Sequence, residues 1–228
     1  MEITSRIESS ATTCSPSSRE RSSSRRRLSN APSLHLNSMA DPIEMFRDLF
    51  EQAVQTCVEP EAMVLSTVDP DGRPSSRWVL LKAFDQRGFV FYTNLDSRKA
   101  RALTVNPYGS LCFYWAPIER QVRIEGPVER VSDEQADAYF ATRPREFQVA
   151  AWASRQSAVL DSRPILDERV AEVGRRFEGH PVCRPPFWSG FRVIPSAMEF
   201  WTRDPARLHH RERYARDGDV WIRTFLYP

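Results

Sequence analysis

The sequence predicts an α+β fold in which a β-barrel carries peripheral helices. Short runs of β-branched and aromatic residues, bounded by turn signals, recur from residue 62 to the C-terminus, as is typical of antiparallel strands. Helix-start signals interrupt these runs at several points, so helices are expected between groups of strands. At 228 residues, the chain is long enough for one such domain with a substantial core.

Local capping signals place the helices. Asp41 precedes Pro42, which is the arrangement of an N-cap followed by proline at the first helical position. Ser132 and Gln135 have the spacing of a capping box, and Ser97 can cap a further short helix. Helices are therefore expected over residues 42–57, 98–103, 133–142, 145–153 and 164–177.

The strands are expected between turns rich in glycine, proline and aspartate. Residues 69–72 read Asp-Pro-Asp-Gly, which has the composition of a turn. The runs 77–82 and 89–94 are joined by a short polar turn that contains Gly88, so we expect them to pair as a hairpin. Strands are expected over residues 62–68, 75–84, 89–94, 110–115, 121–131, 191–195, 199–202, 207–214 and 220–225.

Four cations surround this hairpin and indicate an anion site. Arg77 and Lys82 lie at the rim of its first run, and Arg98 and Lys99 follow the second. If Ser97 caps a helix, the Ser-Arg-Lys group lies at a helix N-terminus, where free backbone N–H groups and the positive dipole end suit a phosphate. A strand pair with a solvated basic rim remains the alternative, and spacing alone favours it.

Residues 1–38 differ in composition from the rest of the chain. They are rich in Ser and Arg and poor in large apolar residues, so we expect a disordered tail before a domain over residues 39–228. The segment lacks the apolar core of a secretory signal, and its glutamates argue against an organellar transit peptide. Met39 as the functional start is an alternative. We expect a cytoplasmic localisation.

Composition excludes several classes of function. The formal net charge is +2, which gives no general argument for nucleic-acid binding. No apolar run approaches the length of a membrane span. The four cysteines are scattered, match neither a zinc pattern nor a disulfide framework, and fit a reducing compartment. We expect no metal site, no membrane and no nucleic-acid partner.

A series of short motifs from residue 39 to the C-terminus resembles the pyridoxine/pyridoxamine 5'-phosphate oxidase family. The motifs stand in the family's order, which is far more specific than any one of them. They are Arg77-Trp78-Val79-Leu80-Leu81-Lys82, Phe91-Tyr92-Thr93-Asn94, Ser97-Arg98-Lys99, Arg120-Gln121-Val122, Tyr139 with Arg143-Pro144, Ser154-Arg155-Gln156-Ser157, Glu199-Phe200-Trp201 and Arg207-Leu208-His209.

The resemblance implies an FMN-binding split β-barrel that forms a homodimer with two sites at the subunit interface. It implies FMN as the cofactor and Arg207 and His209 as the catalytic pair near the reacting carbon. Substrate-binding residues would be Lys82, Tyr139, Arg143, Arg207, Leu208 and His209. Cofactor-binding residues would be Arg77, Trp78, Val79, Leu80, Leu81, Lys82, Tyr92, Thr93, Ser97, Arg98, Lys99, Gln121, Gln156, Ser157, Trp201 and Arg211.

The implied reaction belongs to vitamin B6 salvage. Pyridoxamine or pyridoxine 5'-phosphate would be oxidised to pyridoxal 5'-phosphate, with O2 as acceptor and H2O2 as product. The residues leave the choice between the amine and the alcohol open. Two alternatives stay open as well: a flavin oxidase acting on another substrate, as phenazine-type members of this fold do, and a low-turnover protein that binds FMN or a B6 phosphate.

Several positions depart from the family's pattern, mostly in the substrate half. The family's phosphate-binding serine, four residues after the arginine of Arg-Pro, is Phe147 here. Phenylalanine has no donor and a larger body, so we expect a weakened phosphate pocket. The other departures are Ser189 in the Trp-Gly-Gly turn, Thr202 and Arg203 after Trp201, His210 in place of aspartate, and Phe225 in place of a C-terminal arginine.

Overall fold

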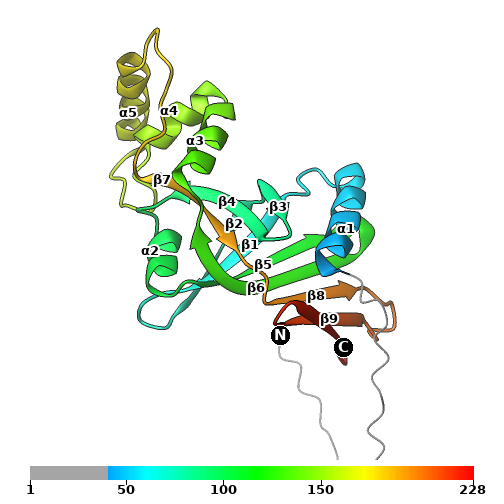
Figure 1. Ribbon diagram of the computed structural model, residues 1–228. Helices are drawn as coiled ribbons and strands as arrows, with labels where there is room; N and C mark the ends of the chain where they lie inside the picture. The colour runs from blue at the N-terminus through cyan, green and yellow to red at the C-terminus, as the bar shows by residue number, and fades with distance from the viewer. Residues whose placement is uncertain (1–40) are drawn as a thin grey trace, which may run out of the picture. The chain divides into compact units, whose positions relative to one another are not determined.

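The computed structural model describes residues 41–228, which form a curled antiparallel sheet with helices at its periphery (Figure 1). The predicted tail over residues 1–38 lies outside the described residues. The strands are β1 (Ala62–Val68), β2 (Pro74–Leu80), β3 (Ala83–Asp85), β4 (Gly88–Asn94), β5 (Tyr108–Trp115), β6 (Arg120–Arg130), β7 (Trp188–Val193), β8 (Ala197–Thr202), β9 (His210–Asp217) and β10 (Val220–Phe225). The helices are α1 (Pro42–Thr56), α2 (Arg98–Val105), α3 (Asp133–Thr142), α4 (Arg145–Ala153), α5 (Arg163–Arg176) and the short 3-10 helix η1 (Ala116–Ile118).

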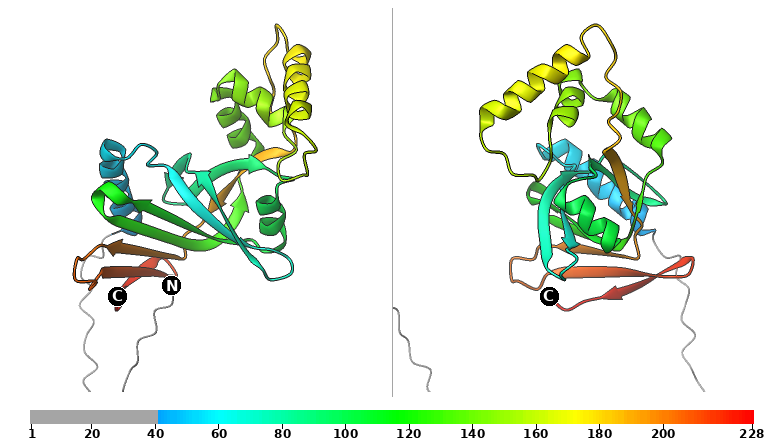
Figure 2. Two further views of the ribbon diagram at one scale, coloured as in Figure 1. Left: turned by 180° about the vertical axis from the view of Figure 1, so that it is seen from behind. Right: turned by 90° about the vertical axis from the view of Figure 1, so that its left-hand side faces the viewer.

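Strand β6 is the element from which the barrel is built. It pairs with β5 through residues 120–127, with β8 through residues 120–125 and with β7 through residues 128–130. The main path runs β10-β9-β8-β6-β5-β1-β2, and β7 continues from β6 through β4 to β3. Because one long strand serves both branches, the sheet curls into a half-open barrel, as the views in Figure 2 show.

Helix α1 supplies a side chain to the barrel core, and its start follows the capping signal. The Oδ1 atom of Asp41 accepts a hydrogen bond from the backbone N–H of Ile43 at 2.8 Å. The fully buried Phe46 packs its ring 4.8 Å from the ring of Phe89 and 5.1 Å from that of Phe113. Aromatic pairs of this kind add to the stability of simple apolar burial.

Helices α3, α4 and α5 gather beside β7, at the end of the barrel away from β8 and β9 (Figures 1 and 2). Phe140 of α3 and Val149 of α4 are buried in a second apolar cluster with Trp188 of β7. Gly190 permits the close approach here, because a Cβ at this position would lie 2.8 Å from the Tyr92 ring. This packing sets the helical wall of the candidate site against the sheet.

Two expected strands were wrong in extent, and one pairing was wrong. The strand expected over residues 75–84 is interrupted at Leu81 and Lys82, because the N–H of Leu81 binds the carbonyl of Glu61 while that of Lys82 binds the carbonyl of Val90. The chain therefore changes partner: β2 pairs with β1, and only β3 forms the hairpin with β4. In the segment expected over 207–214, residues 207–209 are not part of a strand: they form the end of the loop before β9, after a turn in which the N–H of Arg207 donates to the carbonyl of Asp204.

The other expected helices and strands are present with ends shifted by at most about three residues. Ser97 and Ser132 cap their helices as predicted, with side-chain oxygens accepting from Ala100 and Gln135. None of the described helices combines the length and apolarity needed to cross a membrane.

Candidate functional site

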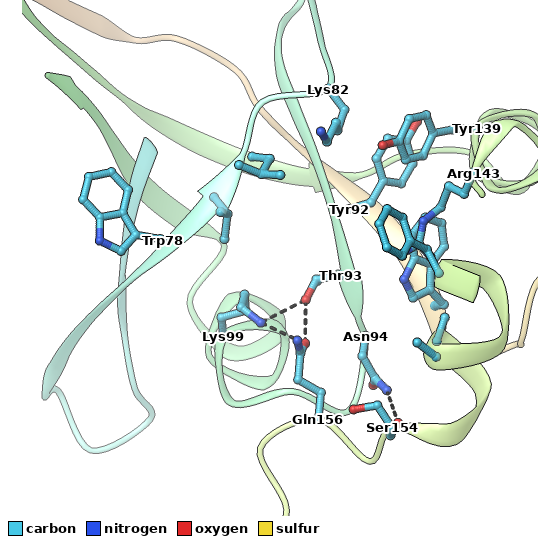
Figure 3. A pocket seen from close by; sticks show the side chains of 16 residues that line it. Trp78, Lys82, Tyr92, Thr93, Asn94, Lys99, Tyr139, Arg143, Ser154 and Gln156 are labelled. Atoms are coloured by element: carbon cyan, nitrogen blue, oxygen red, sulfur yellow. Dashed lines mark hydrogen bonds between the residues drawn. The ribbon is translucent and has the colours of Figure 1, made fainter. Parts of the chain in front are cut away.

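A cavity of about 380 Å³ lies between the end of β2, strand β4 and helices α3 and α4 (Figure 3). Ten residues that the sequence assigned to the site line it: Trp78, Val79, Leu80, Lys82, Tyr92, Thr93, Lys99, Tyr139, Arg143 and Gln156. Phe147, singled out above as a departure, lines it too. Sequence reasoning missed five further lining residues, which are Asn94, Ala150, Ala151, Ser154 and Trp188.

Lys99 forms one side of this cavity and is held as a buried cation. Its side chain is 8% exposed, and Nζ donates to Thr93 Oγ1 at 3.0 Å, to Gln156 Oε1 at 3.0 Å and to Ser97 Oγ at 3.2 Å. Burial, together with the charge of the nearby Arg77 guanidinium, lowers the pKa of this ammonium to about 8. An anion in the cavity would relieve both effects, so the group is suited to a phosphate.

Two arginines that do not line the cavity extend this cation group: Arg77 on β2 and Arg98 at the N-terminus of α2. Arg77 does not line the cavity; its Nη1 donates to Thr67 Oγ1 at 2.8 Å, and burial lowers its pKa. The backbone N–H of Arg98 donates to Ser157 Oγ at 3.2 Å, which ties Ser157 to the helix start. Sequence reasoning missed Asp69, read only as a turn residue, whose Oδ2 accepts from Arg98 Nε at 3.0 Å.

Stacked aromatic rings form the opposite wall. The Tyr92 ring lies 4.0 Å from the Tyr139 ring and 5.3 Å from the Trp188 ring, and both pairs are nearly parallel. The guanidinium carbon of Arg143 lies 4.8 Å from the centre of the Trp188 ring. Aromatic planes and a guanidinium on one wall suit a flat ring carrying an anionic group.

Arg143 carries a buried donor without a partner. Its Nη1 atom is inaccessible to solvent and makes no hydrogen bond within the described residues. Burial lowers the pKa of this guanidinium. Because an unpaired buried donor is costly, the arrangement favours an acceptor supplied by a ligand.

The remaining predicted site residues form a second group outside this cavity. Gln121, Trp201 and Arg211 are directly paired across β6, β8 and β9, so they share one row on one face of the sheet. The His209 ring lies 4.7 Å from the Trp201 ring, which brings the loop segment 207–209 to this row.

The loop that carries the candidate catalytic residues is shaped by a left-handed backbone conformation and a local hydrogen bond. Arg207 has a positive φ of 66°, which is uncommon for a residue with a side chain. The N–H of Asp204 donates to Nδ1 of His209 at 3.2 Å, which places a neutral ring's proton on Nε2. Arg207, Leu208 and His209 do not line the cavity, and Leu81, 5% exposed, belongs to the core. A single chain therefore holds two separate groups of predicted site residues.

Two of the departures from the family's pattern contact each other. The rings of His210 and Phe225 lie 5.6 Å apart, edge to face, on neighbouring strands β9 and β10. The two residues therefore form an aromatic pair across these strands. Phe147, by contrast, lines the cavity and is 53% exposed.

Two family models match the parts of the chain that contain the two groups of predicted site residues. A family model described as pyridoxamine 5'-phosphate oxidase matches residues 49–177, and one described as the pyridoxine 5'-phosphate oxidase C-terminal dimerisation region matches residues 188–228. The pyridoxine/pyridoxamine 5'-phosphate oxidase of Myxococcus xanthus is 57% identical over 189 residues, which cover 82% of this chain and 92% of that protein. The protein of that name from Gluconobacter oxydans is 49% identical over 202 residues, covering 88% of this chain and all of the relative.

Two solved structures share the fold. PhzG from Burkholderia lata, in complex with tetrahydrophenazine-1-carboxylic acid, has a TM-score of 0.79 and 33% identity, and the match covers 88% of this chain and 99% of that one. An FMN-binding, pyridoxamine 5'-phosphate oxidase-related protein from Nostoc punctiforme has a TM-score of 0.66 over 82% of this chain and 98% of that one. At 17% identity, the second shows the fold alone, a split barrel.

Proposed function

Because the chain belongs to the pyridoxamine 5'-phosphate oxidase family, we propose that it oxidises pyridoxamine or pyridoxine 5'-phosphate to pyridoxal 5'-phosphate. It is an FMN-dependent oxidoreductase of vitamin B6 metabolism, and FMN is its cofactor. Its C-terminal dimerisation region supports a homodimer. In the proposed reaction O2 accepts two electrons and two protons to give H2O2. The amine substrate also consumes water and releases ammonia, so that atoms balance.

The observation that carries this proposal is the unpaired, buried Nη1 atom of Arg143 beside Lys82 and Tyr139. Figure 3 shows Tyr139 and Arg143 on one side of β4 and the Lys99 group on the other. One cavity thus offers two separate positions for anions. FMN and a B6 phosphate carry one phosphate each, which supports their binding in a single site.

The residues present fit FMN. Lys99, Arg98 and Ser157 would hold its phosphate at the N-terminus of α2, since an ammonium, a guanidinium, a hydroxyl donor and the positive end of the helix dipole all favour a dianion. When bound, FMN supplies the redox chemistry of the reaction. The rim of β2 and the aromatic wall would hold flat rings and exclude water.

The second group of residues would complete the cavity of the partner subunit. Gln121, Trp201 and Arg211 would reach the cofactor, and Arg207 and His209 the substrate ring. The observation behind this step is that the second group, apart from Gln121, lies within residues 188–228, which the dimerisation region matches. With His209 Nδ1 occupied by the Asp204 N–H, its Nε2–H would be the donor that orients the substrate.

Peroxide release from the purified, FMN-loaded protein tests the proposed function. With pyridoxamine 5'-phosphate, we expect H2O2 and pyridoxal 5'-phosphate in equal amounts, and no release without substrate. Pyridoxamine lacking the phosphate is the matched control, and it should react poorly because Arg143 and Lys82 lose their ligand. Equal rates with and without the phosphate, or no peroxide at all, would overturn the proposal.

Oxidation of a different substrate is the second candidate function. It is favoured by Phe147 in the cavity wall and by the similarity to PhzG, whose structure contains tetrahydrophenazine-1-carboxylic acid. A larger aromatic ring could pack against Phe147 where a phosphate would lack a donor. The same peroxide assay with that compound distinguishes the two: turnover exceeding that with pyridoxamine 5'-phosphate would select the second candidate.

A further inference from the structure

Arg211 is held at two atoms of its guanidinium. Its Nε donates to Glu199 Oε1 at 2.7 Å, and its Nη1 donates to the backbone carbonyl of Tyr227 at 2.9 Å. The carbonyl of Arg211 in turn accepts from the N–H of Leu226 at 3.0 Å, so strand β9 and the C-terminal segment are bound to each other at this residue. These contacts restrict a side chain that otherwise has much rotational freedom.

Glu199 is a buried carboxylate whose two oxygens serve different arginines. The residue is 8% exposed in the centre of β8. Oε1 accepts from Arg211, and Oε2 accepts from Arg123 Nη1 at 3.4 Å. The desolvation cost of a buried ion pair can exceed its electrostatic gain, so these pairs need not stabilise the fold, but they do fix the direction of the arginine side chains.

The contacts with Glu199 and Tyr227 leave one edge of the Arg211 guanidinium without a partner among residues 41–228. Arginine has five N–H donors, and the contacts within residues 41–228 use Nε and Nη1 but leave Nη2 without a partner. Arg211 lies directly opposite Trp201, which lies opposite Gln121, so its side chain belongs to the row assigned above to the cofactor.

We propose that Glu199 is a positioning residue for the cofactor: it orients Arg211 so that Nη2 faces FMN in the assembled dimer, with the Tyr227 carbonyl as the second support. The inference rests on the proposed assignment of Arg211 to the cofactor. Ordering the arginine before FMN binds removes a cost from the binding step, so loss of Glu199 should weaken FMN binding by about 5- to 30-fold.

The test measures the Kd for FMN by fluorescence titration of the apoprotein, with dimer content followed by light scattering. Glu199→Gln keeps the size of the side chain but loses the charge, and we expect the 5- to 30-fold rise in Kd. Arg123→Gln is the matched control, because it removes the other arginine on the same carboxylate. It should change Kd by no more than about twofold.

A double-mutant cycle separates positioning from a general structural role. In an Arg211→Ala background, Glu199→Gln should change Kd by no more than about twofold, since the residue it positions is gone. An undiminished effect in that background, or an equal effect of Arg123→Gln, would overturn the proposal. If Arg211→Ala alone leaves Kd unchanged, the assignment of Arg211 to the cofactor fails instead. Should Glu199→Gln not fold, Glu199→Asp, which keeps the charge but shortens the reach, is used in the same cycle with the same expected outcomes.

Discussion

The buried ammonium of Lys99 makes FMN binding depend on pH in a defined direction. Burial and the Arg77 charge lower its pKa to about 8 from the ordinary value of 10.5. Below pH 8 the apoprotein already carries the cation that a phosphate needs. Above pH 8 the lysine must take up a proton when FMN binds, because the phosphate raises its pKa again. FMN affinity should therefore be constant from about pH 7 to 8 and fall above it.

The size of the change in Kd for FMN follows from the lowered pKa of Lys99. With a pKa of about 8, about half of the apoprotein is protonated at Lys99 at pH 8 and about one molecule in a hundred at pH 10, so Kd should rise by about 50-fold between these values. In the same pH range, the stability of the apoprotein changes in the opposite direction to its affinity for FMN. Between pH 8 and 10.5 the unfolded chain holds a proton that the folded chain has lost, so this group makes the free energy of unfolding rise with pH.

Titration of the apoprotein with FMN between pH 7 and pH 10 measures the effect, and Lys99→Met is the control. Methionine keeps a similar length without a charge, so the variant should bind FMN more weakly at pH 7 and show no change in slope near pH 8. A wild-type Kd that stays constant to pH 10 would refute the reasoning. So would a variant that keeps the wild-type slope, because another group would then be titrating.

Four further predictions concern the substrate site, the turn, the tail and the assembly. Phe147→Ser should restore a hydroxyl donor and lower KM for pyridoxamine 5'-phosphate by about 10- to 100-fold, from the strength of a hydrogen bond to a charged group. An unchanged or higher KM would mean that the phenylalanine packs a rebuilt pocket. Arg207→Ala and His209→Ala should reduce kcat/KM far more than FMN retention, and equal losses would place both residues beside the cofactor. Deleting residues 1–38 should leave FMN binding and turnover nearly unchanged, because the segment has few core-forming residues; a large loss of turnover would mean that the tail closes over the site. Light scattering should give a dimer, and an FMN-loaded monomer at micromolar concentration would contradict the shared site.

Sequence signals located most helices and strands because those signals act over a few residues. Asp41, Ser97 and Ser132 each cap a helix through a hydrogen bond to an N–H two or three positions along the chain. The break at Leu81 and Lys82 was missed for the opposite reason. Both residues belong to one apolar run, and only the carbonyls of Glu61 and Val90, 20 and 8 residues away, make the strand change partner.

For the candidate site, too, some features were predictable from the sequence and others depended on the fold. Its residue types and their order in the chain were sufficient to assign the family and its cofactor. Only the fold shows that these residues form two separate groups in one chain. Lys99 lines the cavity, whereas Arg211 lies on strand β9. Asp69 and Glu199 likewise gained meaning only there, as the carboxylates that hold Arg98 and Arg211. A motif records which side chains are available, but burial, pairing across strands and the direction of an arginine's free edge depend on contacts between residues far apart in the chain.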